Sequence, residues 1–477
     1  MGYIEDKNTF IAEFVRVLEN SNLSLFLGAG MSFEVGLPSW KNLLANLSRE
    51  IGIDIEDSQD YYQIAQYCEN YHGFAYVRNE INTLLTPKTH TSSILNRILK
   101  LPTNSFWTTN FDRVLEHNIE MEFGYYPEII YRDVDLTKTR KKSARVIYKM
   151  NGHIDDYSSW ILTKQDLEGY EYSHQAMLTF LKRELIVNTF LFLGYSFSDN
   201  LILSALHNIR KCFGEVESSH FHYTILEERE NPEFPHFILN LNKSYGIKCL
   251  IIPKDLFGNN LNRTEQNFAI NTERINIIDT ISQHIKMKQI YISGSYREIS
   301  SQEENFSIQL SRCLTANILE HGYRICNSFG KGVGTRIIEY ASEWLIEHNQ
   351  QVDKKLILKS RSFHNYTGTN DDTKKYRTYI MRDSGIALFM FGQGNANVSE
   401  SAGVQQEFIV AKELGLKIIP LGVTGYESKK IWNEIKTNIS SYGYLEKYID
   451  ILGKETDVEK LVRVVITIIT ELQRTIC

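Results

Sequence analysis

Short apolar segments that end in glycine or small polar residues constrain the fold of this chain most strongly. In its first half they cover residues 23–32, 104–110, 144–152, 189–196, 221–228 and 247–253. Helix-like segments separate most of them, and this alternation is typical of a mainly parallel sheet with helices on both faces. A chain of 477 residues has room for more than one such core. We therefore predict an α/β protein built of two doubly wound Rossmann-like domains with mainly parallel sheets.

A polar, asparagine-rich segment interrupts the alternation and becomes helical over residues 275–288. A second α/β series follows it, and within that series the polar residues 361–376 are expected to form a loop. The strands expected in the second series cover 289–296, 323–329, 385–392 and 416–423. The predicted organisation is a first domain over 1–253, a connector over 254–287 and a second domain over 288–477.

Composition and charge exclude several kinds of partner. The net charge of −6 and the pI near 6.2 argue against a nucleic-acid partner, which usually needs a basic face. The first residues do not form a signal peptide, and no apolar run is long enough to span a bilayer. We therefore expect a cytoplasmic protein that does not contact a membrane. No two of the six cysteines form a C-x-x-C pair, so they are expected to be small core residues and no metal site is expected.

Four of the first-half strands end in clusters of small or polar residues. These clusters cover residues 28–32, 108–112, 151–153 and 194–199. In open α/β sheets, ligands bind beyond the carboxyl ends of the strands. Glycines at such a position let backbone N–H groups approach a pyrophosphate, although a lone G-x-G is equally common in a plain tight turn. The sequence therefore predicts a nucleotide site at this edge of the first sheet.

The spacing around these turns is more specific than the glycines alone. GAGMSFEVGLPSW (28–40) resembles the nucleotide loop of sirtuins, and TTNFD (108–112) resembles their T-x-N-x-D motif. Together with VIYKMNG, FLFLGYSFSD, ISGS, GKGVG and GVQQEF, these motifs give the whole chain a resemblance to the Thoeris antiphage-defence NADase effectors. In that family a sirtuin-like domain is joined to a SLOG-type domain, which implies an enzyme that takes NAD as its substrate.

The resemblance implies roles for individual residues of the first domain. Asn110 would be the central catalytic residue, because its amide could hold a water against the anomeric carbon of the nicotinamide ribose, and Asp112 would hold ribose or brace the loop. The nicotinamide ring of NAD is already cationic and leaves as a neutral base. Cleavage of its bond to ribose therefore needs positioning more than strong acid catalysis. The nucleotide contacts that the resemblance implies are Gly28, Ala29, Gly30, Ser32, Asp112, Asn151, Gly194, Ser196 and Asp199.

Four residues expected near this site have alternative explanations. Sirtuins carry His-Gly where this chain has Asn151 and Gly152, followed by His153. If the strand stays extended, residues 151 and 153 point to the same face, and His153 would supply the imidazole as the second catalytic residue. Otherwise His153 is a plain loop residue. Asp199 is equally well explained as the N-cap of the next helix, and Trp40 either forms a wall of the pocket or belongs to the core.

The second half carries two more glycine turns after apolar strands, which suggest a second phosphate-binding crevice. By resemblance to SLOG domains, this crevice would bind a nucleotide-derived signal, and in the Thoeris family the signal is a cyclic ADP-ribose isomer made by a partner enzyme with a TIR domain. Arg377 matches the family's ligand-binding arginine and Glu407 its acidic residue, although both could be solvated helix charges. The signal-binding residues implied are Gly294, Ser295, Gly330, Gly332, Arg377 and Glu407.

These features predict a regulated NAD glycohydrolase that depletes NAD in an infected cell when the second domain binds its signal. The resemblance also implies a homo-oligomer, a tetramer or larger. Two alternatives remain: a non-catalytic nucleotide-sensing scaffold, and an ADP-ribosyl transferase or cyclase that uses the same site. Deacetylation is disfavoured, because deacetylating sirtuins normally carry a four-cysteine zinc module and this chain lacks that spacing and any obvious inserted domain.

Overall fold

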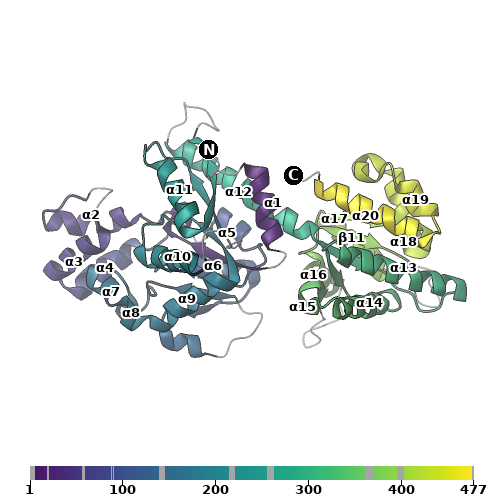
Figure 1. Cartoon of the computed structure of the whole chain (residues 1–477), viewed down its shortest axis with the longest axis horizontal. Helices are drawn as coiled ribbons and strands as arrows, with labels where there is room; N and C mark the ends of the chain where they lie inside the picture. Colours follow the sequence, from purple (N-terminus) through teal and green to yellow (C-terminus); the bar gives the residue numbers. More distant parts are fainter. Residues whose placement is uncertain are drawn as a thin grey trace. The chain divides into compact units, whose positions relative to one another are not determined.

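A computed structural model describes most of the chain and divides it into two compact units, Met1–Asp279 and Thr280–Cys477. The described residues are 6–18, 21–55, 60–87, 89, 91–138, 145–213, 221–254, 263–359, 370–394 and 402–474. The division between the units falls inside a long helix, α12 (Arg263–Met287). Each unit contains a sheet of its own with helices packed around it (Figure 1).

The sheet of the first unit has seven strands in the order β3-β4-β2-β1-β5-β6-β7, and every pairing is parallel. The strands are β1 (Asn22–Leu27), β2 (Ser105–Thr108), β3 (Glu128–Ile130), β4 (Val146–Lys149), β5 (Asn188–Leu193), β6 (His222–Glu227) and β7 (Ile247–Ile252). The chain builds one side of the sheet from β1 and then the other from β5, so the strand order reverses between these two central strands. Ligands of open α/β sheets bind at such a switch point.

The central strands are continuous apolar runs in the sequence because they are buried. All six residues of β5 and the last five of β1 are buried, as expected for parallel strands covered on both faces. The described helices of this unit are α1 (Lys7–Val17), α2 (Trp40–Glu50), α3 (Tyr61–His72), α4 (Phe74–Leu84), α5 (Ser93–Ile98), α6 (Val114–Phe123), α7 (Lys164–Glu168), α8 (Tyr170–Ser173), α9 (Gln175–Val187), α10 (Asn200–Phe213), α11 (Phe234–Tyr245) and the first part of α12. Short 3₁₀ turns, including η1 (Ala29–Met31), connect some of them.

Helices α2, α3 and α4 form a helical module between β1 and β2. They are grouped at one end of the first unit in Figure 1 and share a hydrophobic cluster that includes Leu44, Ile64 and Ile81. Side-chain caps begin two of them, because Ser39 accepts a hydrogen bond from the Asn42 N–H and Asp60 accepts from the N–H groups of Tyr62 and Gln63.

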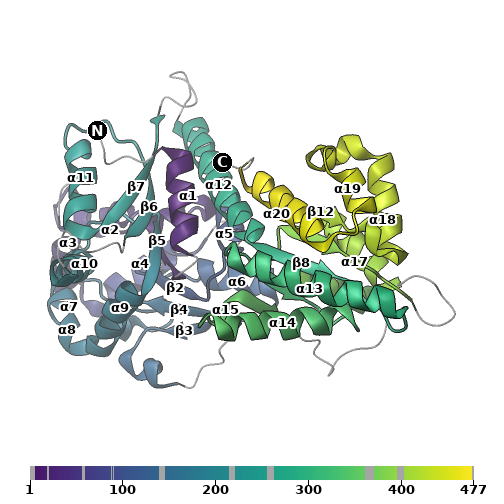
Figure 2. The same cartoon turned by 45° about the vertical axis from the view of Figure 1, so that its right-hand side comes forward.

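The second unit has a five-stranded, wholly parallel sheet in the order β10-β9-β8-β11-β12. Its strands are β8 (Gln289–Ser293), β9 (Arg324–Asn327), β10 (Leu356–Leu358), β11 (Ile386–Phe389) and β12 (Lys417–Pro420). Its helices are α13 (Ser301–Glu320), α14 (Val333–Glu347), α15 (Val352–Lys355), α16 (Asn370–Met381), α17 (Ala402–Glu413), α18 (Tyr426–Thr437), α19 (Ile449–Lys454) and α20 (Val458–Arg474). Helices α13 and α14 lie side by side (Figure 2). The strand order reverses between β8 and β11.

The predicted α/β class with two doubly wound, mainly parallel sheets is confirmed. Two short edge strands, β3 and β10, were not predicted. The predicted polar loop over 361–376 is wrong in its last part, because residues from Asn370 onward are helical in α16. Residues 361–369 of that loop lie outside the described part of the chain, as do residues 255–262 of the predicted connector, whose helix begins at Arg263.

Candidate active site

The loops after β1 and β5 are packed directly against each other. The Gly28 N–H donates to the Leu193 carbonyl at 2.9 Å and the Gly30 N–H to the Gly194 carbonyl at 3.0 Å. A Cβ on Gly28 would lie 2.3 Å from the Gly194 carbonyl oxygen, and Gly194 itself has a left-handed φ of 62°. Loop packing therefore requires these glycines, and the N–H groups of Gly28 and Gly30 already have partners within the protein.

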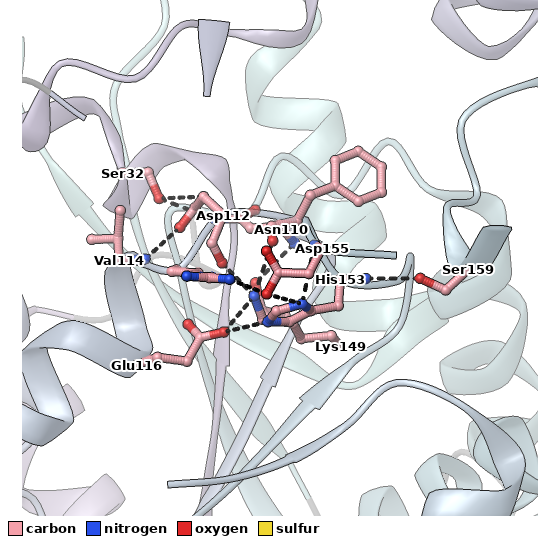
Figure 3. A network of polar contacts seen from close by, with 12 residues as sticks. Ser32, Asn110, Asp112, Val114, Glu116, Lys149, His153, Asp155 and Ser159 are labelled. Carbon is pink, nitrogen blue, oxygen red and sulfur yellow. Dashed lines mark hydrogen bonds and ion pairs between the residues drawn. The ribbon is translucent and has the colours of Figure 1, made fainter. Parts of the chain in front are cut away.

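Three predicted side chains meet at the carboxyl ends of β1 and β2. The Asn110 amide Nδ2 donates to Ser32 Oγ at 3.2 Å, and Ser32 Oγ donates to Asp112 Oδ2 at 3.1 Å (Figure 3). Asp112 Oδ1 also accepts a hydrogen bond from the Val114 N–H, at the start of α6. Ser32 and Asp112 are buried, whereas Asn110 is partly exposed. The structure thus joins Asn110, Ser32 and Asp112 in one network at this edge of the sheet.

Burial raises the pKa of the Asp112 carboxyl, and the nearby positive charge of Lys149 opposes this rise. Lys149, the last residue of β4, and Glu116 on α6 were not singled out by sequence reasoning. Their side chains form an ion pair of 2.6 Å and are 1% and 0% exposed. The signal that could have identified Lys149 is a lysine at the end of an otherwise apolar strand.

Asn151 and His153 do not share a face, because β4 ends at Lys149 and the chain turns at Gly152, whose φ is 99°. The Asn151 amide donates to Tyr62 Oη at 3.4 Å. His153 is directed elsewhere: its Nε2 lies 3.6 Å from Glu116 Oε1 and its Nδ1 accepts from the Asp155 N–H at 3.3 Å. The extended strand on which the catalytic use of His153 depended is therefore not formed.

Other predicted residues of this edge have visible structural roles. Asp199 is buried and accepts a hydrogen bond from the Leu201 N–H at 2.9 Å, so it caps the start of α10. Burial raises its pKa. Ser196 is exposed and its hydroxyl is bonded to that of Ser198. The Trp40 ring is only partly buried and lies 5.4 Å from the ring of Tyr62, the partner of Asn151.

The second unit has a comparable arrangement at its switch point. A Cβ on Gly294 would lie 2.4 Å from the Met390 carbonyl oxygen, and one on Gly330 would lie 2.3 Å from the Gly294 carbonyl oxygen. Gly332 has a left-handed φ of 81° and faces the ring of Tyr296. Here again the loops after the central strands approach too closely for larger residues. The Ser295 carbonyl accepts hydrogen bonds from the N–H groups of residues 392 and 393.

Glu407 on α17 lies where β8 and β9 end. Its carboxylate accepts hydrogen bonds from Ser293 Oγ at 2.6 Å and from Ser328 Oγ at 3.3 Å. Burial raises the pKa of Glu407, while the Ser293 hydroxyl and the charge of Arg377 on α16 lower it. The Arg377 Nε is buried and has no hydrogen-bond partner among the described residues, and its Nη1 donates only weakly to the Thr373 carbonyl at 3.4 Å. Arg377 therefore keeps donor capacity beside Glu407.

Within the described ranges, no three His, Cys, Asp or Glu side chains are grouped to hold a metal ion. None of the described helices combines the length and apolar character needed to cross a bilayer. Of the described cysteines, Cys68, Cys249 and Cys326 are buried, whereas Cys212 is exposed and is not the core residue that was expected. Cys477 lies outside the described residues.

Comparison with known proteins gives two family matches. Residues 104–250 match the SIR2-like domain, and residues 273–472 match the Sir2- and TIR-associating SLOG family. A protein from Cytobacillus dafuensis named NAD(+) hydrolase ThsA is 31% identical, over 92% of this chain and 90% of that protein. Proteins of the same name from Bacillus cereus and Acinetobacter baumannii are 30% and 28% identical, and each match covers at least nine-tenths of both chains. The chain therefore belongs to the ThsA family of NAD(+) hydrolases, with a SIR2-like domain followed by a SLOG domain.

Proposed function

We propose that this chain hydrolyses NAD to ADP-ribose and nicotinamide in its first domain, residues 1–253. Membership of a family of NAD(+) hydrolases supports the reaction. The observation that carries the choice of site is the network of Asn110, Ser32 and Asp112, which lies at the carboxyl ends of the central strands. This edge is where open α/β sheets bind nucleotides.

The chemistry asked of these residues is mainly positional. Nicotinamide leaves NAD as a neutral base from a cationic ring, so the C–N bond breaks without a strong acid. Asn110 holds the attacking water at the anomeric carbon through its amide oxygen, because its Nδ2 is already bonded to Ser32. Asp112 braces this arrangement from the buried side. The nucleotide is held by the loops that carry Gly28, Ala29, Gly30, Gly194 and Ser196.

Asn151 and His153 are assigned different roles by their contacts. Asn151 faces Tyr62, next to Trp40, and is the residue in the histidine register of sirtuins. His153 contacts the buried Glu116 and therefore affects the site indirectly, through that carboxylate. We therefore expect Asn151→Ala to lower NAD turnover at least about tenfold, because misplacing a positioned group can cost about 100-fold. We expect His153→Ala to lower turnover less, because His153 contacts Glu116 and not the substrate side of the site. Parallel turnover assays of the two variants test this order, and a larger loss at His153 would restore it as the general base.

The second domain, residues 288–477, is proposed to be a sensor that binds a cyclic ADP-ribose isomer and activates NAD cleavage. Arg377 and Glu407 support this choice, because an arginine with free donor capacity suits a phosphate and a carboxylate suits ribose hydroxyls. A partner enzyme with a TIR domain would supply the signal, and loss of NAD would then serve antiphage defence in the cytoplasm. We also propose assembly into a homo-oligomer.

One experiment tests this function against its rivals. Purified full-length protein is incubated with NAD, with and without cyclic ADP-ribose isomers, and the products are separated by chromatography. ADP-ribose and nicotinamide in equal amounts support hydrolysis. Cyclised or transferred ADP-ribose would indicate a cyclase or a transferase, and no turnover under any condition would favour a nucleotide-sensing scaffold.

A further inference from the structure

A buried lysine lies beneath the turn that carries Asn110. The Lys149 Nζ donates hydrogen bonds to the carbonyl of Phe111 at 3.0 Å and to the carbonyl of Asp112 (Figure 3). Its counter-ion Glu116 is completely buried. An ammonium removed from water is tolerated only when it is paired and hydrogen-bonded. The position of Lys149 is therefore fixed by three oxygens, two of which belong to the turn itself.

Stability does not explain why a charged pair occupies this place. Replacing a buried ion pair with apolar residues of similar volume is often neutral or stabilising. An apolar side chain, however, could not donate to the two carbonyls of the turn. Asn110 and Asp112 both belong to this turn, and both are bonded to Ser32. Any shift of the turn would therefore move both candidate active-site side chains together.

The Glu116 carboxylate also contacts His153, in the loop after β4. Glu116 Oε1 lies 2.6 Å from Lys149 Nζ and 3.6 Å from His153 Nε2. The Phe111 carbonyl in turn accepts a second hydrogen bond, from the Ile154 N–H at 3.1 Å. The turn after β2 and the loop after β4 are thus held to each other through one buried cluster of Lys149, Glu116 and His153.

We propose that Lys149 and Glu116 are positioning residues for NAD cleavage: the ammonium fixes the turn that presents Asn110 and Asp112, and the carboxylate fixes both the ammonium and the His153 ring. This inference rests on the proposed role of Asn110 in hydrolysis. Neither residue contacts the substrate in this proposal. Their effect passes through the backbone of the turn.

The charges around Asp112 give a readout that a purely structural role would not change. Burial raises the pKa of Asp112, Lys149 lowers it, and Glu116 raises it by a smaller amount. Without Lys149 the pKa of Asp112 rises further, so the carboxylate is protonated at a higher pH. If ionised Asp112 is needed, the acidic limb of the pH profile of NAD turnover moves to higher pH.

The test uses three full-length variants: Lys149→Met, the double variant Lys149→Met with Glu116→Leu, and a matched control. The control replaces another paired lysine and glutamate of the same unit, Lys248 on β7 and Glu13 on α1, with Met and Leu. We expect Lys149→Met to lower the Tm, because it leaves Glu116 buried without its ammonium partner. The double variant should have a Tm close to that of the wild type, because it removes both charges. In the double variant, kcat for NAD should fall at least about tenfold while KM changes little, as expected for lost positioning. The acidic limb of the pH profile of NAD turnover should also move to higher pH in the double variant.

Hydrogen exchange of the amides over residues 108–114 provides a measurement that does not depend on NAD. These amides should exchange at least about tenfold faster in the double variant and at the wild-type rate in the control. Wild-type kcat and exchange in a folded double variant would overturn the inference. A double variant that fails to fold while the control folds would also overturn it, because the pair would then support stability. If the wild type itself does not cleave NAD, the proposed function fails, and the exchange rates still decide whether Lys149 fixes the turn.

Discussion

Asn110→Ala is expected to reduce NAD cleavage at least about 100-fold, because misplacing a positioned group by about 1 Å can already cost this much. The Asn110 amide lies at the end of β2 and is the partly exposed member of its network. Its removal takes away the group that would hold the attacking water. The measurement is release of nicotinamide from NAD by the full-length protein under the conditions that activate the wild type.

The fold should survive this substitution. Asn110 is not part of a hydrophobic core, and Ser32 Oγ keeps its hydrogen bond to Asp112 when the amide is removed. Asn70→Ala on α3, an exposed asparagine whose side chain accepts a hydrogen bond from the Gln66 amide, serves as the control for loss of an amide. A well-folded Asn110→Ala protein that cleaves NAD at the wild-type rate would contradict the assignment of the site.

The central strands could be predicted from the sequence because parallel strands buried on both faces are continuous apolar runs. β5 and β11, for example, are buried along their whole length. The edge strands β3 and β10 contain three residues each, which is too short for an apolar pattern to stand out. Helix α16 begins among charged residues that suit a loop equally well, and what distinguishes the helix is its packing against α17 and β9.

The candidate site could be predicted only in part, because a sequence motif identifies residues but does not say in which direction their side chains point. The resemblance of TTNFD to the sirtuin motif named Asn110 and Asp112, and the structure places both beside Ser32. The directions of Asn151 and His153 depended on whether β4 stays extended. The chain instead turns at Gly152, which has a φ of 99° and where a Cβ would lie 2.2 Å from the Ser159 carbonyl oxygen. Glu116 and Lys149 lie on different elements, so their pairing emerges only when the sheet and α6 are packed.

Arg377→Ala is expected to abolish activation by a cyclic ADP-ribose isomer and to weaken binding of that isomer at least about tenfold, since a hydrogen bond to a charged group contributes roughly 1.5–3 kcal/mol. A ligand activates only if it binds the active arrangement more tightly than the inactive one. The loss of its strongest charged contact should therefore remove both binding and response. Calorimetry with the cyclic ADP-ribose isomers, paired with NAD turnover assays on the full-length protein, measures the two effects.

The matched control is Arg382→Ala, because this arginine follows α16 and its guanidinium lies over the Tyr379 ring at the surface. It should bind the signal and respond as the wild type does. Glu407→Gln provides a second probe: it keeps the shape of the side chain that Ser293 and Ser328 contact but removes the charge. Because burial already raises the pKa of Glu407, a neutral group is tolerated there, and we expect a smaller loss of affinity than for Arg377→Ala. A normal response by Arg377→Ala would leave the second domain as a candidate sensor but place its ligand away from α16.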